Sequence, residues 1–316
     1  MDDRTLRWAA KPSHLRGIPR HIVITTIGGF AKFVTSVLNS TQVHNKETLL
    51  KLVTSRPRGA SLLTVSNHMS TLDDPLMWGF RGFPISNPKL SRWILTAEDI
   101  CFTNPIYSYF FRLGKCIPIT RGAGIYQPQM NEALDRMNDG EWLHTFPEGK
   151  VYQGPEPIRR LKWGVGSLIA RAAVPTIVLP IAHSGFENVM PENYMFRRRP
   201  LLPLGWKKIS IVVGEPIQFD VAGLKQAAKS IAVDSFCSQL PLTPSNFGTN
   251  LLNDSHDGTF KRFSKFVETF HTAERKEAVV LDKTQLKWVY RQITEQIQVV
   301  LQELSSKART LNSLSS

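Results

Sequence analysis

The chain has 316 residues, of which 42% are hydrophobic and 21% charged, a composition typical of a globular protein with a large core. Its 39 Lys and Arg residues outnumber its 26 Asp and Glu residues, and the net charge of +13 predicts an anionic partner. No zinc-finger spacing, ribonucleoprotein signature or basic helix indicates nucleic acid, so we expect an anionic membrane. Three cysteines at unrelated spacings argue against a disulfide framework and a structural zinc site, and we expect no metal or cofactor.

Residues 1–42 are predicted to form a basic N-terminus and a membrane-interface helix. The run 22–43 is mostly apolar and about long enough to span a bilayer, but Lys32 and the pair Gly28–Gly29 interrupt it. A basic flank followed by an interrupted apolar run is typical of a helix that lies in the interface or dips into one leaflet. The alternative is a helix that packs on the protein's own core. The first 21 residues match neither a secretory signal nor a serine-rich transit peptide, so targeting stays open.

A histidine and an aspartate follow the apolar run 61–65, which is predicted to be a short buried strand. On a continuous helix, His68 and Asp73 would lie about 140° apart, so they can meet only if the chain bends between them. Pro75 predicts a helix that begins there with Asp74 as its cap. The pair would then lie on a loop at the end of a strand, where α/β folds place their chemistry. Asp73 would orient the imidazole and His68 would remove a proton.

The spacing of His68 and Asp73 has other interpretations. A histidine that closes a loop beside an aspartate that caps a helix would give the same pattern. Metal binding is a third interpretation, although no further His or Cys cluster at ligand spacing supports it. The function of the pair therefore depends on the rest of the chain.

Strands and helices alternate as far as about Phe219 and predict an α/β domain, residues 43–219, with a mixed sheet and flanking helices. Arg121 ends one predicted strand, and a Phe146-Pro147-Glu148-Gly149 turn ends another. A guanidinium can donate two parallel hydrogen bonds to two phosphate oxygens, and glycine lets a backbone approach a phosphate or glycerol group closely. Beyond the run 61–65, strands are expected at residues 93–96, 117–121, 142–146, 174–182 and 209–217, and helices at 46–54, 104–113, 128–138, 162–172 and 222–233.

Basic residues gather in two places after the turn at Gly149. The first group is predicted to attract phosphate, and the second, which mixes basic and aromatic residues, is typical of a lipid headgroup region. The first comprises Lys150, Arg159, Arg160 and Lys162; the second comprises Tyr194, Phe196, Arg197, Arg198, Arg199, Trp206, Lys207 and Lys208.

Residues 220–316 are predicted to form a C-terminal helical extension. Residues 241–257 are rich in Pro, Ser, Asn and Gly and predict a loop. Apolar residues then recur at helical spacing from Leu286 to Leu304. We expect this long amphipathic helix to pack on the domain itself, with self-association into a homo-oligomer as the alternative.

Four blocks of sequence resemble, in content and order, those of the glycerolipid acyltransferase family, between about Val43 and Ile217. The resemblance implies the fold of that family and transfer of an acyl chain to a lipid hydroxyl. It implies that His68 and Asp73 are catalytic and that Arg121 contacts the phosphate of the acceptor. The blocks are Asn67-His68-x4-Asp73, Arg121 after an apolar strand, Phe146-Pro147-Glu148-Gly149, and Val174-Pro175-x4-Pro180. The other residues expected to bind substrate are Phe146, Pro147, Glu148, Gly149 and Lys150.

Shorter runs resemble one branch of that family, the CoA-independent transacylases of mitochondria. This resemblance implies remodelling of cardiolipin from monolysocardiolipin and phosphatidylcholine. It also implies peripheral or one-leaflet association with the inner membrane, or with the outer membrane facing the intermembrane space. Tyr152 departs from the branch, in which asparagine is expected. An acyl-CoA-dependent acyltransferase and a non-catalytic lipid-binding protein remain alternatives. The runs are Asp99-Ile-Cys101-Phe-Thr103, Leu113-Gly-Lys-Cys116, Lys150-Val151 and Lys162-Trp163-Gly164.

Overall fold

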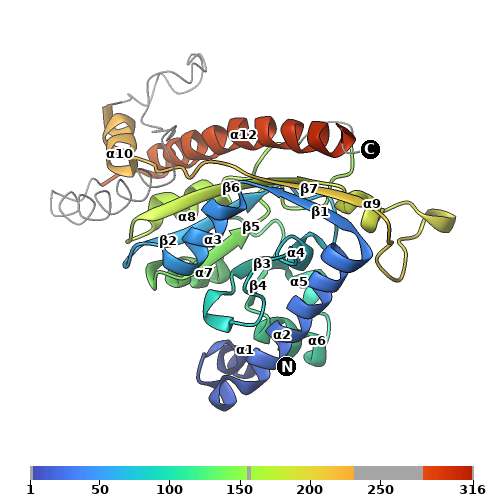
Figure 1. Ribbon diagram of the computed structural model, residues 1–316. Helices are drawn as coiled ribbons and strands as arrows, with labels where there is room; N and C mark the ends of the chain where they lie inside the picture. The colour runs from blue at the N-terminus through green and yellow to red at the C-terminus, as the bar shows by residue number, and fades with distance from the viewer. Residues whose placement is uncertain (1–2, 155–157, 231–279, 315–316) are drawn as a thin grey trace.

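The computed structural model describes residues 3–154, 158–230 and 280–314, and the strands in these ranges form one sheet (Figure 1). The seven strands lie in the order β1-β7-β6-β2-β5-β3-β4. Neighbouring strands are parallel except β6 and β7, which are antiparallel, so the predicted mixed sheet is confirmed. The strands are β1 Ser40–His44, β2 Ser61–Ser66, β3 Trp93–Ala97, β4 Cys116–Ile119, β5 Trp142–Thr145, β6 Thr176–Ser184 and β7 Lys208–Val213.

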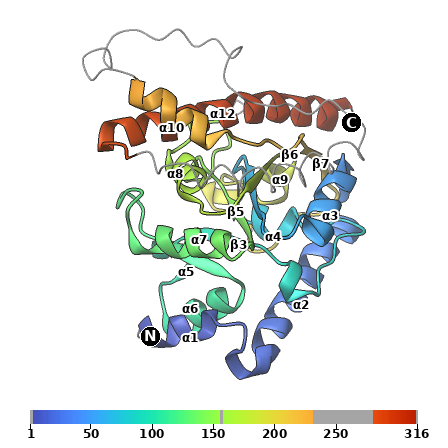
Figure 2. The same ribbon diagram turned by 90° about the vertical axis from the view of Figure 1, so that its left-hand side faces the viewer.

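Helices cover both faces of the sheet, as the sequence predicts. The helices predicted between residues 46 and 230 are all present, with ends within a few residues of the prediction. Residues 231–233 of the last predicted helix lie outside the described residues. Figure 2 shows α10 and α12 on one side of the molecule and α1 and α2 on the other. The helices are α1 Asp3–Ala10, α2 Ile18–Phe33, α3 Lys46–Ser55, α4 Asp73–Leu76, α5 Glu98–Cys101, α6 Pro105–Leu113, α7 Pro128–Asn138, α8 Gly164–Arg171, α9 Phe186–Val189, α10 Val221–Ser230 and α12 Lys283–Leu314.

The central strands β2 and β6 are buried along their whole length. Their side chains alternate between two apolar clusters, as the period of a strand requires. Leu63 and Val65 belong to the cluster with α7, α8 and α12, whereas Leu62 belongs to the cluster with α3 and α4. Because β2, β5, β3 and β4 run parallel, the loops that follow them meet at one edge of the sheet.

The long C-terminal helix α12 packs on the domain, as the sequence predicts. Val289, Ile293 and Ile297 are fully buried in the cluster that includes α8. The two helices approach closely at Gly166 of α8, where a Cβ would overlap the carbonyl group of Tyr290. The predicted loop at residues 241–257 lies outside the described residues, as does Cys237.

The N-terminal apolar element differs from the prediction at both ends. Helix α2 begins at Ile18 instead of residue 22, with proline in its first turn, and it continues through a π-helical segment, Val34–Leu38. Asn39 ends it by donating a side-chain hydrogen bond of 3.0 Å to the Val34 carbonyl. Residues 40–44 are strand β1, paired with β7, so the predicted boundary between residues 42 and 43 falls inside a strand.

Helix α2 has one covered face and one uncovered face. Val23, Ile24 and Ala31 are buried, whereas Ile22 and Phe33 are exposed. The helical stretch His14–Leu38 is long and apolar enough to cross a membrane by length and composition, and only 22% of its most apolar window is buried. The helix therefore packs on the core and also presents apolar side chains outward, while its place in a membrane interface stays a prediction.

Candidate active site

The loop after β2 brings His68 and Asp73 together. His68 Nδ1 lies 2.9 Å from Asp73 Oδ2, and the same oxygen accepts backbone hydrogen bonds from Met69 at 2.6 Å and Ser70 at 2.8 Å. Asp73 is completely buried, while 20% of the His68 side chain is exposed. Since Nδ1 faces a carboxylate, it carries the proton of the neutral ring, and Nε2 is left with a lone pair that can accept a proton.

The adjacent Asp74 does not cap a helix, so that prediction is wrong. Helix α4 begins at Asp73 without a side-chain cap, and Asp74 has a non-helical backbone. Its carboxylate instead forms an ion pair with Arg92 and accepts a hydrogen bond of 2.6 Å from Trp78 Nε1. Burial would raise the pKa of Asp74, but the charge and hydrogen bonds of Arg92 outweigh it and hold that pKa below its ordinary value.

The turn after β5 supports His68 from two directions. The Phe146 ring stacks on the imidazole with 4.1 Å between ring centroids and 15° between ring planes. Glu148 is buried, and its two carboxylate oxygens accept backbone hydrogen bonds from His68 at 2.8 Å and from Arg159 at 2.9 Å. Burial raises the pKa of Glu148. Each carboxylate oxygen therefore accepts a backbone N–H, and Glu148 fixes the loop that carries His68.

The other residues expected to bind substrate fall into two groups. Arg121, Gly149 and Lys150 line the same cavity as His68. Arg121 is ion-paired with Asp99 at the rim of this cavity. Pro147 is instead buried, and its carbonyl accepts a hydrogen bond of 2.8 Å from the Lys162 backbone, so it shapes the turn.

This cavity has a volume of about 770 Å³ and is largely apolar. The inner face of α2 forms one wall, and α6 with the loops after β2 and β3 forms others. Cys101 and Cys116 also line it, and burial raises the pKa of both thiols, which keeps them protonated at neutral pH. A cavity of this shape and chemistry suits an acyl chain. Among the apolar residues that line it are Val23, Ile24, Ile27, Phe83, Ile94, Phe110 and Phe111.

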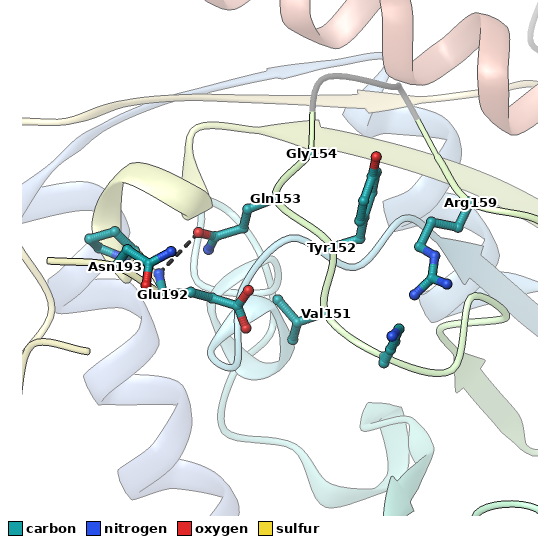
Figure 3. Close-up of a pocket in the computed structure, with 9 residues that line it drawn as sticks. Val151, Tyr152, Gln153, Gly154, Arg159, Glu192 and Asn193 are labelled. Atoms are coloured by element: carbon teal, nitrogen blue, oxygen red, sulfur yellow. Dashed lines mark hydrogen bonds between the residues drawn. The ribbon is translucent and has the colours of Figure 1, made fainter. Parts of the chain in front are cut away.

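A second, polar cavity of about 580 Å³ adjoins the first. Figure 3 shows Tyr152 and Arg159 along one wall and Glu192 extending toward Val151 from the other. The two cavities share Lys150, Val151 and Glu192 as lining residues. The Tyr152 backbone donates a hydrogen bond of 2.7 Å to the His68 carbonyl, which places this cavity directly beside the histidine.

His183 also belongs to this site, although we expect no function for it from the sequence. Its Nε2 lies 3.0 Å from the Asn67 carbonyl and 3.6 Å from Asp73 Oδ2, and the residue is fully buried. The Asn67 side chain exchanges two hydrogen bonds with the His183 backbone, of 2.9 and 3.0 Å. Since Nε2 faces two oxygens, it carries the proton. One feature of the sequence could have indicated a function for His183. The residue directly follows a predicted strand, and α/β folds place functional residues at the edge of the sheet where such strands end.

His144 is buried inside the sheet. Its Nδ1 lies 2.8 Å from Thr64 Oγ1, and burial lowers its pKa to about 3, so the ring is neutral. Among the described residues, no group of three or more His, Cys, Asp or Glu side chains is placed to hold a metal ion.

Comparison with known proteins places these features in a family. The Acyltransferase family matches residues 40–184. N-acylphosphatidylethanolamine synthase of Arabidopsis thaliana is 62% identical over 226 residues, which are 71% of this chain and 80% of that protein. Tafazzin of Drosophila melanogaster is 41% identical over 66% of this chain and 54% of its own length, and Taffazin of Dictyostelium discoideum is 39% identical over 63% and 69%. The chain therefore belongs to the tafazzin-like glycerolipid acyltransferases and is an acyltransferase that acts on phospholipids.

Proposed function

We propose that the protein moves acyl chains between phospholipids and lysophospholipids without CoA, and that it remodels cardiolipin from monolysocardiolipin and phosphatidylcholine. The observation that carries this proposal is the position of His68, which lines the apolar cavity where the polar cavity joins it. Resemblance to proteins named tafazzin supports the choice of cardiolipin and of a mitochondrial membrane. The net charge of +13 suits this anionic lipid.

In the proposed reaction, His68 acts as the general base. Its Nε2 takes the proton of the lysophospholipid hydroxyl, and the oxygen attacks the ester carbonyl of the donor lipid. Asp73 stabilises the imidazolium, which then gives its proton to the departing glycerol oxygen. One ester bond forms and one breaks, so the reaction is reversible, and no serine or cysteine nucleophile is needed.

The binding roles follow from the two cavities. We assign the reacting acyl chain to the apolar cavity. We assign a phosphate group to the cations that line the two cavities, which are Arg121 and Lys150 in the apolar cavity and Lys150 and Arg159 in the polar one. Phe146 and Glu148 hold His68, one by stacking on its ring and the other through its backbone. Pro147 and Gly149 shape the turn that carries both.

A second acceptor is favoured by one comparison. The Arabidopsis relative, 62% identical, is named for synthesis of N-acylphosphatidylethanolamine. The same base could remove a proton from the amine of phosphatidylethanolamine, and attack of the nitrogen would give an amide instead of an ester.

A competition experiment separates the two acceptors. Micelles would contain acyl-labelled phosphatidylcholine, monolysocardiolipin and phosphatidylethanolamine, with no CoA. Label that appears in cardiolipin and is released by mild alkali supports the transacylase. Label in an alkali-stable amide supports the second acceptor. Label that moves only when acyl-CoA replaces phosphatidylcholine as the donor would overturn transfer without CoA.

We also propose that α2 lies in one leaflet of the membrane, through its uncovered face. If apolar insertion dominates, about 1 M salt should leave the wild type bound to vesicles, because screening weakens only the electrostatic attraction. Ile22→Ser/Phe33→Ser should then become releasable by salt in a flotation assay. Complete release of the wild type by salt would refute insertion. This double variant is preferable to deletion of residues 1–42, which would remove part of β1.

We assign His183 a positioning role, since its Nε2–H faces the carboxylate that orients His68. His183→Phe should lower kcat about tenfold or more with little change in KM. His183→Gln keeps an N–H donor and should recover most of kcat. If His183→Gln lost as much of kcat as His183→Phe while both variants stayed as stable as the wild type, this positioning role would be refuted.

A further inference from the structure

The segment between α9 and β7 carries large apolar side chains that none of the described residues cover. Leu201 is 100% exposed, Trp206 94% and Phe196 91%. In Figure 1 this segment, drawn in yellow, projects from the body of the molecule beside the C-terminal end of α2. Removing such side chains from water is favourable, so exposure of several together indicates a surface that meets a partner. We refer to residues 194–206 as the α9–β7 loop.

Hydrogen bonds join this loop to the end of the α2 helix. The Trp206 backbone donates to the Leu38 carbonyl at 2.9 Å. Asn39 lies between the two segments, because its side chain donates to the Leu204 carbonyl at 3.2 Å and accepts from the Lys207 backbone at 2.7 Å. The exposed Val37 precedes this junction. The apolar surface of the loop is therefore continuous with the uncovered face of α2.

Two aromatic residues of the loop have backbone conformations that bulky side chains rarely adopt. Phe196 has φ of 52° and Trp206 has φ of 61°. Such conformations persist where the structure or the function requires them. Since both side chains are almost fully exposed, contacts inside the described protein do not explain why aromatic residues stand there.

The charges around the loop favour a lipid surface. Arg198, Arg199 and Lys208 are exposed near the aromatic side chains, and the whole chain has a net charge of +13. Aromatic rings among basic side chains match the boundary between lipid headgroups and acyl chains. We propose that the α9–β7 loop is a second membrane-inserted element, which places its apolar side chains in the same leaflet as α2, in a bilayer that contains anionic lipid.

The α9–β7 loop and α2 both contribute residues to the lining of the apolar cavity. Arg199 of the loop and Glu192 form an ion pair of 2.7 Å, and both line this cavity. The inner face of α2 lines it as well. With both elements in one leaflet, an acyl chain passes from the bilayer into the cavity without crossing water. This consequence rests on the proposed function, whereas insertion of the loop does not.

The test compares surface variants in two assays. Leu201→Ser/Leu202→Ser and Trp206→Ser remove apolar side chains from the loop. Val299→Ser/Leu314→Ser on α12, which lies on the opposite side of the sheet from α2, is the matched control, since both residues are also exposed. Binding is measured by flotation with phosphatidylcholine vesicles that contain cardiolipin. Transfer is measured both with lipids in these vesicles and with lipids in detergent micelles.

The double leucine variant should bind vesicles about tenfold more weakly or worse, and Trp206→Ser should weaken binding in the same direction. The control should stay within about twofold of the wild type. Transfer from vesicle lipids should fall in parallel, while transfer in micelles stays near the wild-type rate.

Vesicle binding equal to that of the wild type would overturn the proposal. Equal loss of transfer in both assays, with binding intact, would instead make the loop part of the substrate site. If the wild type transferred nothing in micelles, the proposed reaction would fail while the binding assay still decided the role of the loop.

Discussion

Replacing His68 with alanine is expected to lower the rate of acyl transfer by about 10²–10⁴-fold, because a general base commonly contributes that much. Asp73→Asn should lose most of the activity, since an amide would favour the wrong tautomer of the imidazole. The measurement is the initial rate of label transfer between lipids in micelles. Both proteins should bind vesicles as the wild type does, because neither residue belongs to the uncovered apolar surface.

His144→Gln provides a matched control for loss of a histidine. That residue lies on the neighbouring strand β5, where it is buried, neutral and bonded to Thr64. It should change stability more than the rate per folded molecule. If folded His68→Ala kept more than about a tenth of the wild-type rate, His68 would not be the base.

Replacing Arg92 with methionine is expected to lower the free energy of unfolding by about 3–5 kcal/mol, because it leaves the Asp74 carboxylate buried without its partner. The ion pair forms part of the cavity wall beside His68. Asp74→Leu/Arg92→Met removes both charges and should recover most of the loss. Arg291→Met breaks an exposed ion pair with Glu295 and should cost less than about 1 kcal/mol. Urea denaturation measures all of these. An Arg92→Met protein as stable as the wild type would show that the pair does not support the fold.

The same pair predicts a dependence of stability on pH. The pKa of Asp74 is lower in the folded protein than in the unfolded chain. The unfolded chain therefore binds the proton first as the pH falls, and the stability contributed by Asp74 is present above the unfolded pKa. That contribution is lost as the pH falls through the folded pKa. The double variant should lack this component of acid destabilisation, and identical acid profiles would contradict the assignment.

Local patterns were sufficient to predict most of the fold. Apolar runs between turn residues identified the strands, and the helix predicted at residues 128–138 has the bounds of α7. The bend that allows His68 to meet Asp73 also followed from local rules, because the spacing excluded a continuous helix. Long amphipathic periodicity identified α12, since its apolar face has to be covered by other elements.

Partners distant in the sequence explain the differences. Asp74 looked like a helix cap because Arg92, its ion-pair partner, lies 18 residues further along the chain. Arg20 belongs to the predicted basic N-terminus, but it is buried and donates to the carbonyls of Ala9 and Ala10 at 2.9 and 2.8 Å. Burial lowers the pKa of Arg20 to about 10. The start of α2 at Ile18 was missed because the apolar run used for the prediction begins at Ile22.

In the candidate site too, local patterns in the sequence predicted some features, whereas contacts between residues far apart in the chain were not predicted. The type and order of its residues were visible in the sequence, whereas their contacts were not. The two oxygens of Glu148 accept backbone hydrogen bonds from two loops, whereas its contact with the acceptor stays a prediction. His183 was left without a role because its contact with Asp73 depends on the pairing of β6 with β2. No periodicity or spacing along the chain encodes either contact.

The most direct test of the proposed transacylase mechanism follows label in both directions without CoA. Wild type and His68→Ala are each given acyl-labelled phosphatidylcholine with monolysocardiolipin, and, separately, labelled cardiolipin with lysophosphatidylcholine. We expect the wild type to move label to cardiolipin in the first mixture and to phosphatidylcholine in the second, and His68→Ala to do neither at more than about a hundredth of that rate. Transfer that appears only with acyl-CoA as donor, or that proceeds equally well with His68→Ala, would contradict it.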